Sequence, residues 1–259
     1  IAEDIVIGCV TATGEQGSNI GKIGALYAGW PPVSSGLSIN SFCASGVASC
    51  ALAGQKVAVG SEDVVVAGGV ESMSRVPMFG DQGPWFADKA VAKATKFVPV
   101  GIAADLVATR EGIPREDLDT YAVASHARAK VARDGGRFDS ALVPVMDEEG
   151  QIVLVMDENI RDDTTLEKLA GLPAAFEELG REGYDALAVE TYPDIGAMRH
   201  FHTVANAPAS ADGAAAVLIA NEGALKSNDL TPRARIVAAA TSATCPVLKL
   251  IASGSAAEK

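Results

Sequence analysis

The stretch Asn40-Ser41-Phe42-Cys43-Ala44-Ser45-Gly46 decides the fold, because it places a cysteine directly before a long run of small residues. Residues 44–59 mix glycine, alanine and serine with valine and leucine, which is typical of a helix that packs closely against its neighbours. We predict that this helix begins at Ala44 and that Gly60 ends it, since glycine commonly follows the last helical turn.

A cysteine at the start of a helix is a candidate nucleophile. The N–H groups of a first helical turn have no partner within the helix, and the helix dipole adds partial positive charge, so both favour the thiolate form of Cys43. A thiolate that attacks a carbonyl carbon and then leaves again suits acyl transfer. The alternative is a small buried core residue, which free cysteines commonly are, and this segment alone leaves both interpretations open.

The residues around this helix predict alternating strands and helices. Residues 4–10 and 63–67 are short apolar runs, typical of strands buried on both faces of a sheet, while residues 19–27 predict a helix and an extended piece ends near Asn40. This order is typical of a mostly parallel sheet covered by helices, so the predicted fold class is α/β. Two more apolar strands are expected at residues 214–220 and 235–240. Cys9 and Cys50 are expected in the core.

A second block resembles a known family when it is taken together with the cysteine block. Gly68-Gly69-Val70-Glu71-Ser72-Met73-Ser74-Arg75-Val76-Pro77 follows the strand at 63–67 at once, and the two blocks resemble the thiolase family. The chain is most similar to the β-subunit of the fatty-acid β-oxidation trifunctional complex and to related bacterial 3-ketoacyl-CoA thiolases. Shorter matching segments cover nearly the whole chain: Ile7-Gly8-Cys9-Val10, Gly14-Glu15-Gln16-Gly17 with Asn19, Gly136-Arg137-Phe138, Asp212-Gly213-Ala214-Ala215-Ala216, and residues 230–237.

The resemblance implies a thiolase fold of two similar αβαβα halves, with an α-rich loop domain inserted into the first half to hold coenzyme A. On this mapping, residues 1–75 form the first half with the nucleophile helix, residues 76–205 the loop domain, and residues 206–224 the return to the first half. Residues 225–259 open the second half, so we expect an incomplete record of a longer thiolase. Within the loop domain, Pro114 opens an amphipathic helix that Gly135 and Gly136 end.

The resemblance also implies the chemistry. Cys43 would take the acyl group from a 3-ketoacyl-CoA, and free coenzyme A, as cosubstrate, would remove it as a shortened acyl-CoA; the reverse reaction is a Claisen condensation. This needs oxyanion donors, of which the N–H of Cys43 is one, and a base. The family's Asn-Glu-Ala-Phe, Gly-His-Pro and second-cysteine segments do not occur in this sequence. A non-catalytic thiolase-like subunit that binds CoA or a partner is therefore the alternative.

Two residues are the predicted contacts with CoA. By resemblance, Arg161 matches a family arginine near the CoA phosphates or adenine, and Asn206 keeps the family's turn next to the pantetheine arm. Pro208 stands where the family commonly has a serine that hydrogen-bonds this arm, and proline has neither a hydroxyl nor an N–H. For Arg161, a surface ion pair with Asp162 or Asp163 is the open alternative.

A Cys–His hydrolase is the other enzyme class that the sequence allows. His200 or His202 with a distant cysteine fits a Cys–His hydrolase, which we place behind the thiolase, and a buried hydrogen-bonding role accounts for His202 as well.

Charge and composition limit the partners. The net charge of −12 argues against nucleic acid and anionic membranes, which need a clustered positive surface. The basic residues between 126 and 137 either offset the CoA phosphates locally or form a solvated helix face. The cysteines lack the paired spacing of zinc sites or of a disulfide framework, so we expect a reducing compartment and no metal. No apolar membrane span or leader is present, which favours a cytoplasmic protein. No bound cofactor is expected. The resemblance implies a homodimer or tetramer and, for trifunctional-complex members, a hydratase–dehydrogenase partner.

Overall fold

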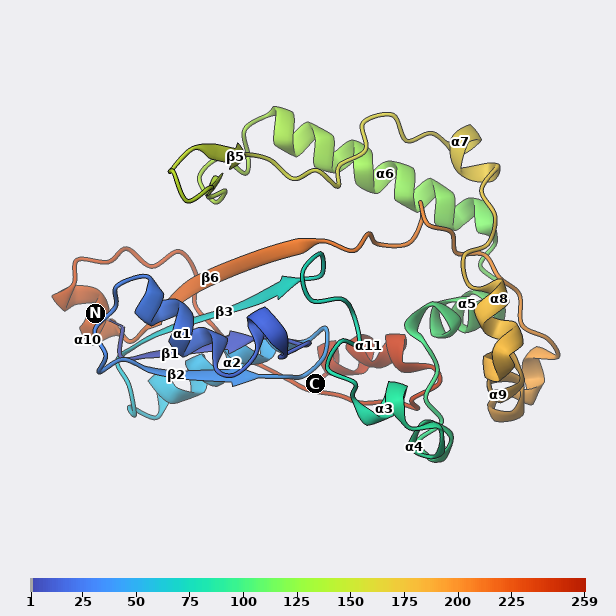
Figure 1. Cartoon of the computed structure of the whole chain (residues 1–259), viewed down its shortest axis with the longest axis horizontal. Helices are drawn as coiled ribbons and strands as arrows, with labels where there is room; N and C mark the ends of the chain where they lie inside the picture. Colours follow the sequence, from blue (N-terminus) through green and yellow to red (C-terminus); the bar gives the residue numbers. More distant parts are fainter. Residues whose placement is uncertain (1) are drawn as a thin grey trace. The chain divides into compact units, whose positions relative to one another are not determined.

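The computed structural model describes residues 2–259 and divides into two compact units (Figure 1). The first comprises Ile1–Lys89 with Ser210–Thr241, and we call it the sheet unit. The second comprises Ala90–Ala209 with Ser242–Lys259, and we call it the helical unit. Each unit combines segments that lie far apart in the sequence.

A four-stranded sheet in the order β2-β1-β3-β6 forms the centre of the sheet unit. β1 (Asp4–Gly8) pairs in parallel with β2 (Ser35–Ile39) and with β3 (Val64–Ser72). β6 (Asp212–Ala220) pairs antiparallel with β3 along its whole length. The strands expected at residues 4–10, 63–67 and 214–220 are confirmed, and the observed β3 extends to Ser72.

Two helices cover opposite faces of this sheet (Figure 1). α2 (Ser45–Ala58) packs on the face that presents the fully buried Val6 and Val65, and α1 (Ile20–Tyr27) packs on the face of Ile5 and Ile7. Because side chains alternate along a strand, residues 5 and 6 of β1 serve different faces. Full burial of each valine contributes about 1.5–3 kcal/mol to folding.

The helical unit has its own apolar core. α5 (Val100–Glu111) contributes Ile102 and Leu106, which are fully buried with Ala188 of α9 (Asp185–Thr191) and with Val247. The long helix α6 (Arg115–Asp134) begins directly after Pro114 and ends at Gly135, so the predicted amphipathic helix is confirmed.

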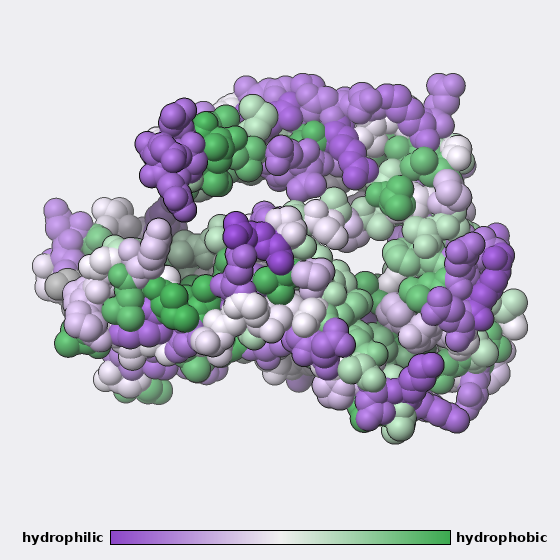
Figure 2. Space-filling model, in the orientation of Figure 1, coloured by the Kyte–Doolittle hydropathy of each residue, from purple (hydrophilic) through white to green (hydrophobic). Residues whose placement is uncertain are grey.

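The remaining elements are short. β4 (Val145–Met146) and β5 (Ile152–Leu154) form a separate two-stranded hairpin whose apolar side chains are exposed, except for the half-buried Leu154, and Figure 2 shows hydrophobic surface over β5. The other helical segments are η1 (Gly14–Gln16), α3 (Pro84–Ala87), α4 (Lys89–Ala94), α7 (Leu166–Ala170), α8 (Glu177–Leu179), η2 (Gly180–Tyr184), η3 (Pro193–Ile195), α10 (Glu222–Ser227), η4 (Lys249–Ile251) and α11 (Ala252–Ala257).

The strand predicted at residues 235–240 is wrong. These residues adopt neither helix nor strand, and Ile236 and Val237 are 49% and 83% exposed. A strand forms only where a neighbouring chain segment satisfies its backbone N–H and C=O groups, and among residues 2–259 no strand pairs with this segment. The apolar run at residues 235–240 was therefore not sufficient to predict a strand.

Candidate functional site

Cys43 lies with an exposed side chain in the turn of residues 40–45 that leads from β2 into α2. Because Cys43 is the candidate nucleophile, we call this segment the nucleophile turn. The helix begins at Ser45 with Ala44 as its N-cap, so the cysteine stands two residues before the first helical residue, one residue further from the helix than predicted. The N–H of Cys43 has no hydrogen-bond acceptor within residues 2–259. It is therefore a candidate donor to a negatively charged oxygen, next to the positive end of the helix dipole.

Ser45 closes this turn onto the helix. Its hydroxyl accepts a hydrogen bond from the N–H of Ser41 at 2.8 Å and donates to the carbonyl of Phe42 at 2.5 Å. The N–H of Ser45 donates to the same carbonyl at 2.9 Å. The residues on either side of Cys43 are thus tied to one another.

Phe42 holds a conformation that is rare for a residue with a side chain. Its φ of +50° lies in the left-handed region, which costs about 1–2 kcal/mol outside glycine. Its ring stacks on Trp85, with 5.1 Å between ring centroids and 9° between planes. Backbone strain of this kind persists only where the surrounding structure fixes it, as these contacts do here.

Gly8 lets the end of β1 approach the first turn of α2. A Cβ atom at this position would lie 2.5 Å from the backbone carbon of Ser45 and 2.7 Å from its Cβ. Such distances are too short for any side chain, so only glycine permits this approach.

Glu71, in the second block that carries the family resemblance, contacts the segments that follow β1 in the sequence. Glu71 of β3 accepts hydrogen bonds from the N–H groups of Val10 and Thr11, at 2.8 and 3.2 Å. The buried Gln16 donates to Glu71 at 2.5 Å and accepts from the N–H of Ser72 at 2.9 Å. Sequence analysis marked both segments but did not predict their contact, because residues so far apart in the sequence meet only through the order of the strands.

The other three cysteines have different surroundings. Cys9 is 2% exposed, as predicted for a core residue, and burial together with Glu71 raises the pKa of its thiol. Cys50 is half-buried and packs against the core between α2 and the sheet. Burial alone would raise the pKa of Cys245, but hydrogen bonds from Tyr192 and from the N–H groups of Val247 and Leu248 lower it. Among the cysteines in the described part of the chain, Cys43 alone has an exposed side chain.

Arg161 lies in an exposed loop of the helical unit. Its backbone N–H donates to Nδ1 of His126 at 3.1 Å, and within residues 2–259 its guanidinium has no ion-pair partner. Asp162 instead pairs with Lys130 and Arg133, and Asp163 with Lys168. The open alternative, an ion pair of Arg161 with one of these aspartates, is therefore not found.

Asn206 holds a turn of the helical unit through its side-chain amide. Its Oδ1 accepts from the N–H of Thr203 at 2.7 Å, and its Nδ2 donates to Asp119 at 2.8 Å and to the carbonyl of Phe201 at 3.3 Å. Both amide hydrogens are thus engaged by the protein, and the predicted contact with CoA stays a prediction. Pro208 is exposed just beyond this turn.

His200 and His202 are bound to a buried carboxylate. Nδ1 of His202 lies 2.7 Å from Asp105, and His200 contacts Asp105 through Nδ1 at 2.8 Å and Asp185 through Nε2 at 3.0 Å. Burial alone would lower the pKa of His200, but the two carboxylates raise it. Both ring nitrogens of His200 are therefore occupied, which does not support the role of a general base in a Cys–His hydrolase.

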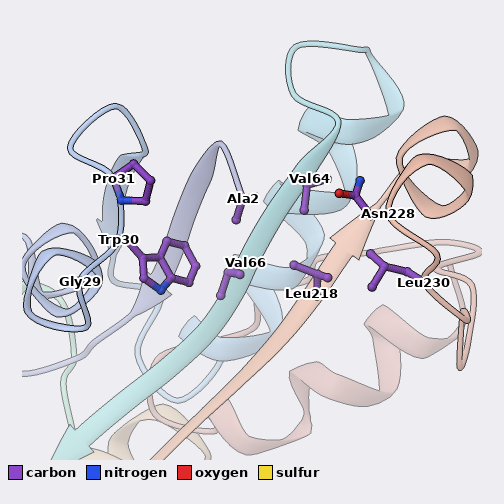
Figure 3. A pocket seen from close by; sticks show the side chains of 9 residues that line it. All are labelled: Ala2, Gly29, Trp30, Pro31, Val64, Val66, Leu218, Asn228 and Leu230. Carbon is purple, nitrogen blue, oxygen red and sulfur yellow. The ribbon is translucent and has the colours of Figure 1, made fainter.

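An apolar groove of about 510 Å³ lies over the sheet, on the face opposite α2 (Figure 3). Val64 and Val66 of β3 and Leu218 of β6 form its floor, with Trp30 at one side and Leu230 at the other. None of the predicted site residues lines it. Among residues 2–259, no group of three His, Cys, Asp or Glu side chains is arranged to hold a metal ion, and no helix is long and apolar enough to span a membrane.

Comparisons with known proteins give one consistent result. Residues 2–182 match the family model described as thiolase, N-terminal domain. The 3-oxoadipyl-CoA/3-oxo-5,6-dehydrosuberyl-CoA thiolase of Escherichia coli strain K12 is 34% identical over 265 residues, covering 95% of this chain and 61% of that protein. The 3-ketoacyl-CoA thiolase of Shewanella frigidimarina is 36% identical over 239 residues, covering 90% of this chain and 56% of that protein.

A solved structure supports the same assignment. Human mitochondrial 3-ketoacyl-CoA thiolase, crystallised in complex with CoA, matches with a TM-score of 0.77 and 30% identity, covering 95% of this chain and 60% of that one. The chain thus spans about 60% of the length of the relatives that it matches. The predicted thiolase fold is confirmed, and the chain belongs to the thiolase family.

Proposed function

We propose that this chain provides the nucleophile of an acyltransferase that cleaves a 3-ketoacyl-CoA with coenzyme A into acetyl-CoA and a shortened acyl-CoA. The observation that carries the proposal is the exposed thiol of Cys43, two residues before α2 and with its own N–H available as a donor. The names of the relatives support the same reaction class.

In the proposed reaction, the Cys43 thiolate attacks the 3-keto carbon of the substrate. The bond between C2 and C3 breaks, C2 takes a proton and leaves as acetyl-CoA, and the remaining acyl group stays on Cys43 as a thioester. The thiolate of a second CoA then attacks this thioester and releases the shortened acyl-CoA and free Cys43. The N–H of Cys43 would stabilise the negative oxygen formed in each attack, as preorganised donors do in acyl transfer.

We further propose that the segment 76–205 forms the loop domain that holds CoA. The guanidinium of Arg161 is exposed and without an ion-pair partner in the described chain, so it is available to a phosphate group. Asn206 would act by shaping the turn next to the pantetheine arm, since its amide is engaged by Thr203, Asp119 and Phe201. CoA would be a cosubstrate and would leave after each turnover.

The remaining predictions about the whole protein are also proposals. We propose that the protein forms homodimers or tetramers and that it binds a hydratase–dehydrogenase partner. Both proposals rest on the family resemblance. A cytoplasmic location rests on the free thiols of all four cysteines, which fit a reducing compartment.

The alternative is a non-catalytic thiolase-like subunit that binds CoA or a partner. It is favoured by Pro208, which removes one hydrogen-bonding group next to the predicted CoA position.

Acylation of the protein distinguishes the two functions. The chain is incubated with acetoacetyl-CoA, digested, and its cysteine peptides are analysed by mass spectrometry. We expect one acetyl group on the Cys43 peptide, none in Cys43→Ser, and unchanged labelling in the control Cys245→Ser. A folded chain whose Cys43 stays unmodified would favour the non-catalytic subunit, and an acetyl group on Cys245 would refute the assignment of the nucleophile.

A further inference from the structure

Asn40 connects the nucleophile turn to the segment that follows β1. Its Oδ1 accepts a hydrogen bond from the N–H of Phe42 at 2.8 Å, and its Nδ2 donates to the carbonyl of Val10 at 2.9 Å. The residue itself is exposed, so its side chain adds little to the buried core. Its hydrogen bonds therefore have their main effect on the geometry of the turn.

The segment that Asn40 contacts, residues 10–11, is itself held by hydrogen bonds with β3 and with Gln16. Glu71 accepts from the N–H groups of Val10 and Thr11, and Gln16 donates to Glu71 and, at 3.0 Å, to the carbonyl of Thr11. Gln16 is buried, and the hydrogen bonds connect three separate segments of the sheet unit. Such a connected polar network fixes one arrangement of the backbone.

The turn needs this anchor because of Phe42. Its φ of +50° is unfavourable for any residue with a Cβ atom, so a free chain would relax toward the extended or right-handed region. Relaxation at residue 42 would redirect the next residue, Cys43, together with its N–H. The hydrogen bond from Phe42 to Asn40 opposes this change.

We propose that Asn40 is a positioning residue for Cys43, which couples the nucleophile turn to the Glu71-anchored segment that follows β1. In this way it fixes the direction of the Cys43 thiol and of the Cys43 N–H. The positioning role of Asn40 rests on the proposed acyl transfer, whereas the structural coupling does not depend on that proposal.

Two measurements on the full chain test the proposal in Asn40→Ala. The matched control is Asn228→Ala, which removes another exposed asparagine of the sheet unit, one whose Nδ2 donates to the carbonyl of Ala224. The first measurement is backbone hydrogen exchange of the peptide covering residues 40–45. We expect exchange about tenfold faster in Asn40→Ala and unchanged in the control, because the Phe42 N–H loses its acceptor.

The second measurement is the rate of Cys43 acylation as a function of acetoacetyl-CoA concentration. The saturating rate should fall about tenfold in Asn40→Ala, while the concentration that gives half of this rate stays unchanged, because Asn40 acts on the nucleophile and not on CoA binding. Asn40→Asp keeps an acceptor for the Phe42 N–H but loses the Nδ2 donor to Val10, so its exchange should lie between the rates of the parent and of Asn40→Ala.

Each outcome decides a separate claim. Exchange that is unchanged in Asn40→Ala would overturn the coupling, whatever the activity. Faster exchange with an unchanged saturating rate would overturn the positioning role. If the parent chain is not acylated at all, the proposed function fails, while faster exchange in Asn40→Ala and intermediate exchange in Asn40→Asp would still support the coupling. Exchange as slow in Asn40→Asp as in the parent would overturn the contribution of the Val10 hydrogen bond.

Discussion

Gly8→Ala tests whether the end of β1 sets the position of the nucleophile turn. The added Cβ would lie 2.5 Å from the backbone carbon and 2.7 Å from the backbone oxygen of Ser45. Carbon atoms in proteins ordinarily approach one another to about 3.5–4.0 Å, so the first turn of α2 would have to move by roughly 1 Å. Overpacking of this kind costs about 1–3 kcal/mol, and we expect about 3 kcal/mol because the opposing atoms are backbone.

Unfolding in urea, followed by tryptophan fluorescence, measures this loss. Both tryptophans, Trp30 and Trp85, belong to the sheet unit, so the signal follows the unit that contains the substitution. Gly24→Ala is the matched control, since Gly24 is exposed within α1 and a Cβ there meets nothing within 4 Å. It should raise the free energy of unfolding by about 0.5–1 kcal/mol. A Gly8→Ala protein as stable as its parent would refute the close approach of β1 and α2.

Three further predictions concern stability. Lys56→Met removes the partner of the buried Asp4, whose carboxylate lies 2.6 Å from Nζ; because Lys56 is 26% exposed, we expect a loss of about 2 kcal/mol in urea unfolding, and no change would contradict the pairing. Burial alone would raise the pKa of Asp4, but hydrogen bonds from Lys56, Ser35 and Ile5 lower it, so its stabilisation is present above about pH 4 and is lost as the pH falls further; Asp4→Asn should weaken this acid dependence. The pKa of His200 is raised, so its stabilisation is complete below about pH 6.5 and is lost as the pH rises; circular dichroism melting between pH 5.5 and 8 should show this loss in the parent and not in His200→Asn, and equal slopes would contradict it.

Local sequence patterns predicted the parts of the fold that depend on local composition. The small residues after Cys43 identified α2, and the branched run at residues 63–67 identified β3, because both patterns report burial against close neighbours. The similar run at residues 235–240 failed, since strand formation also needs a pairing partner that the run itself does not reveal.

The candidate site was predicted less completely. Cys43 was predicted to be the nucleophile from its place before a helix, and this stays a prediction. The contacts that shape its turn join residues far apart in the sequence. Glu71 reaches Val10 and Thr11 through the parallel pairing of β1 with β3, and no pattern within either segment encodes that register. The pairing of His200 with Asp105 has the same origin, because both residues are brought together by packing in the helical unit.

The central claim is that Cys43 carries the acyl group between two CoA molecules, and a pulse-and-chase experiment tests it most directly. The chain is first acylated with acetoacetyl-CoA, and free CoA is then added while the mass of the Cys43 peptide is followed. We predict that the acetyl group appears on Cys43 and is lost on addition of CoA, with acetyl-CoA as the product. An unmodified Cys43, or an acetyl group that CoA does not remove, would contradict the claim.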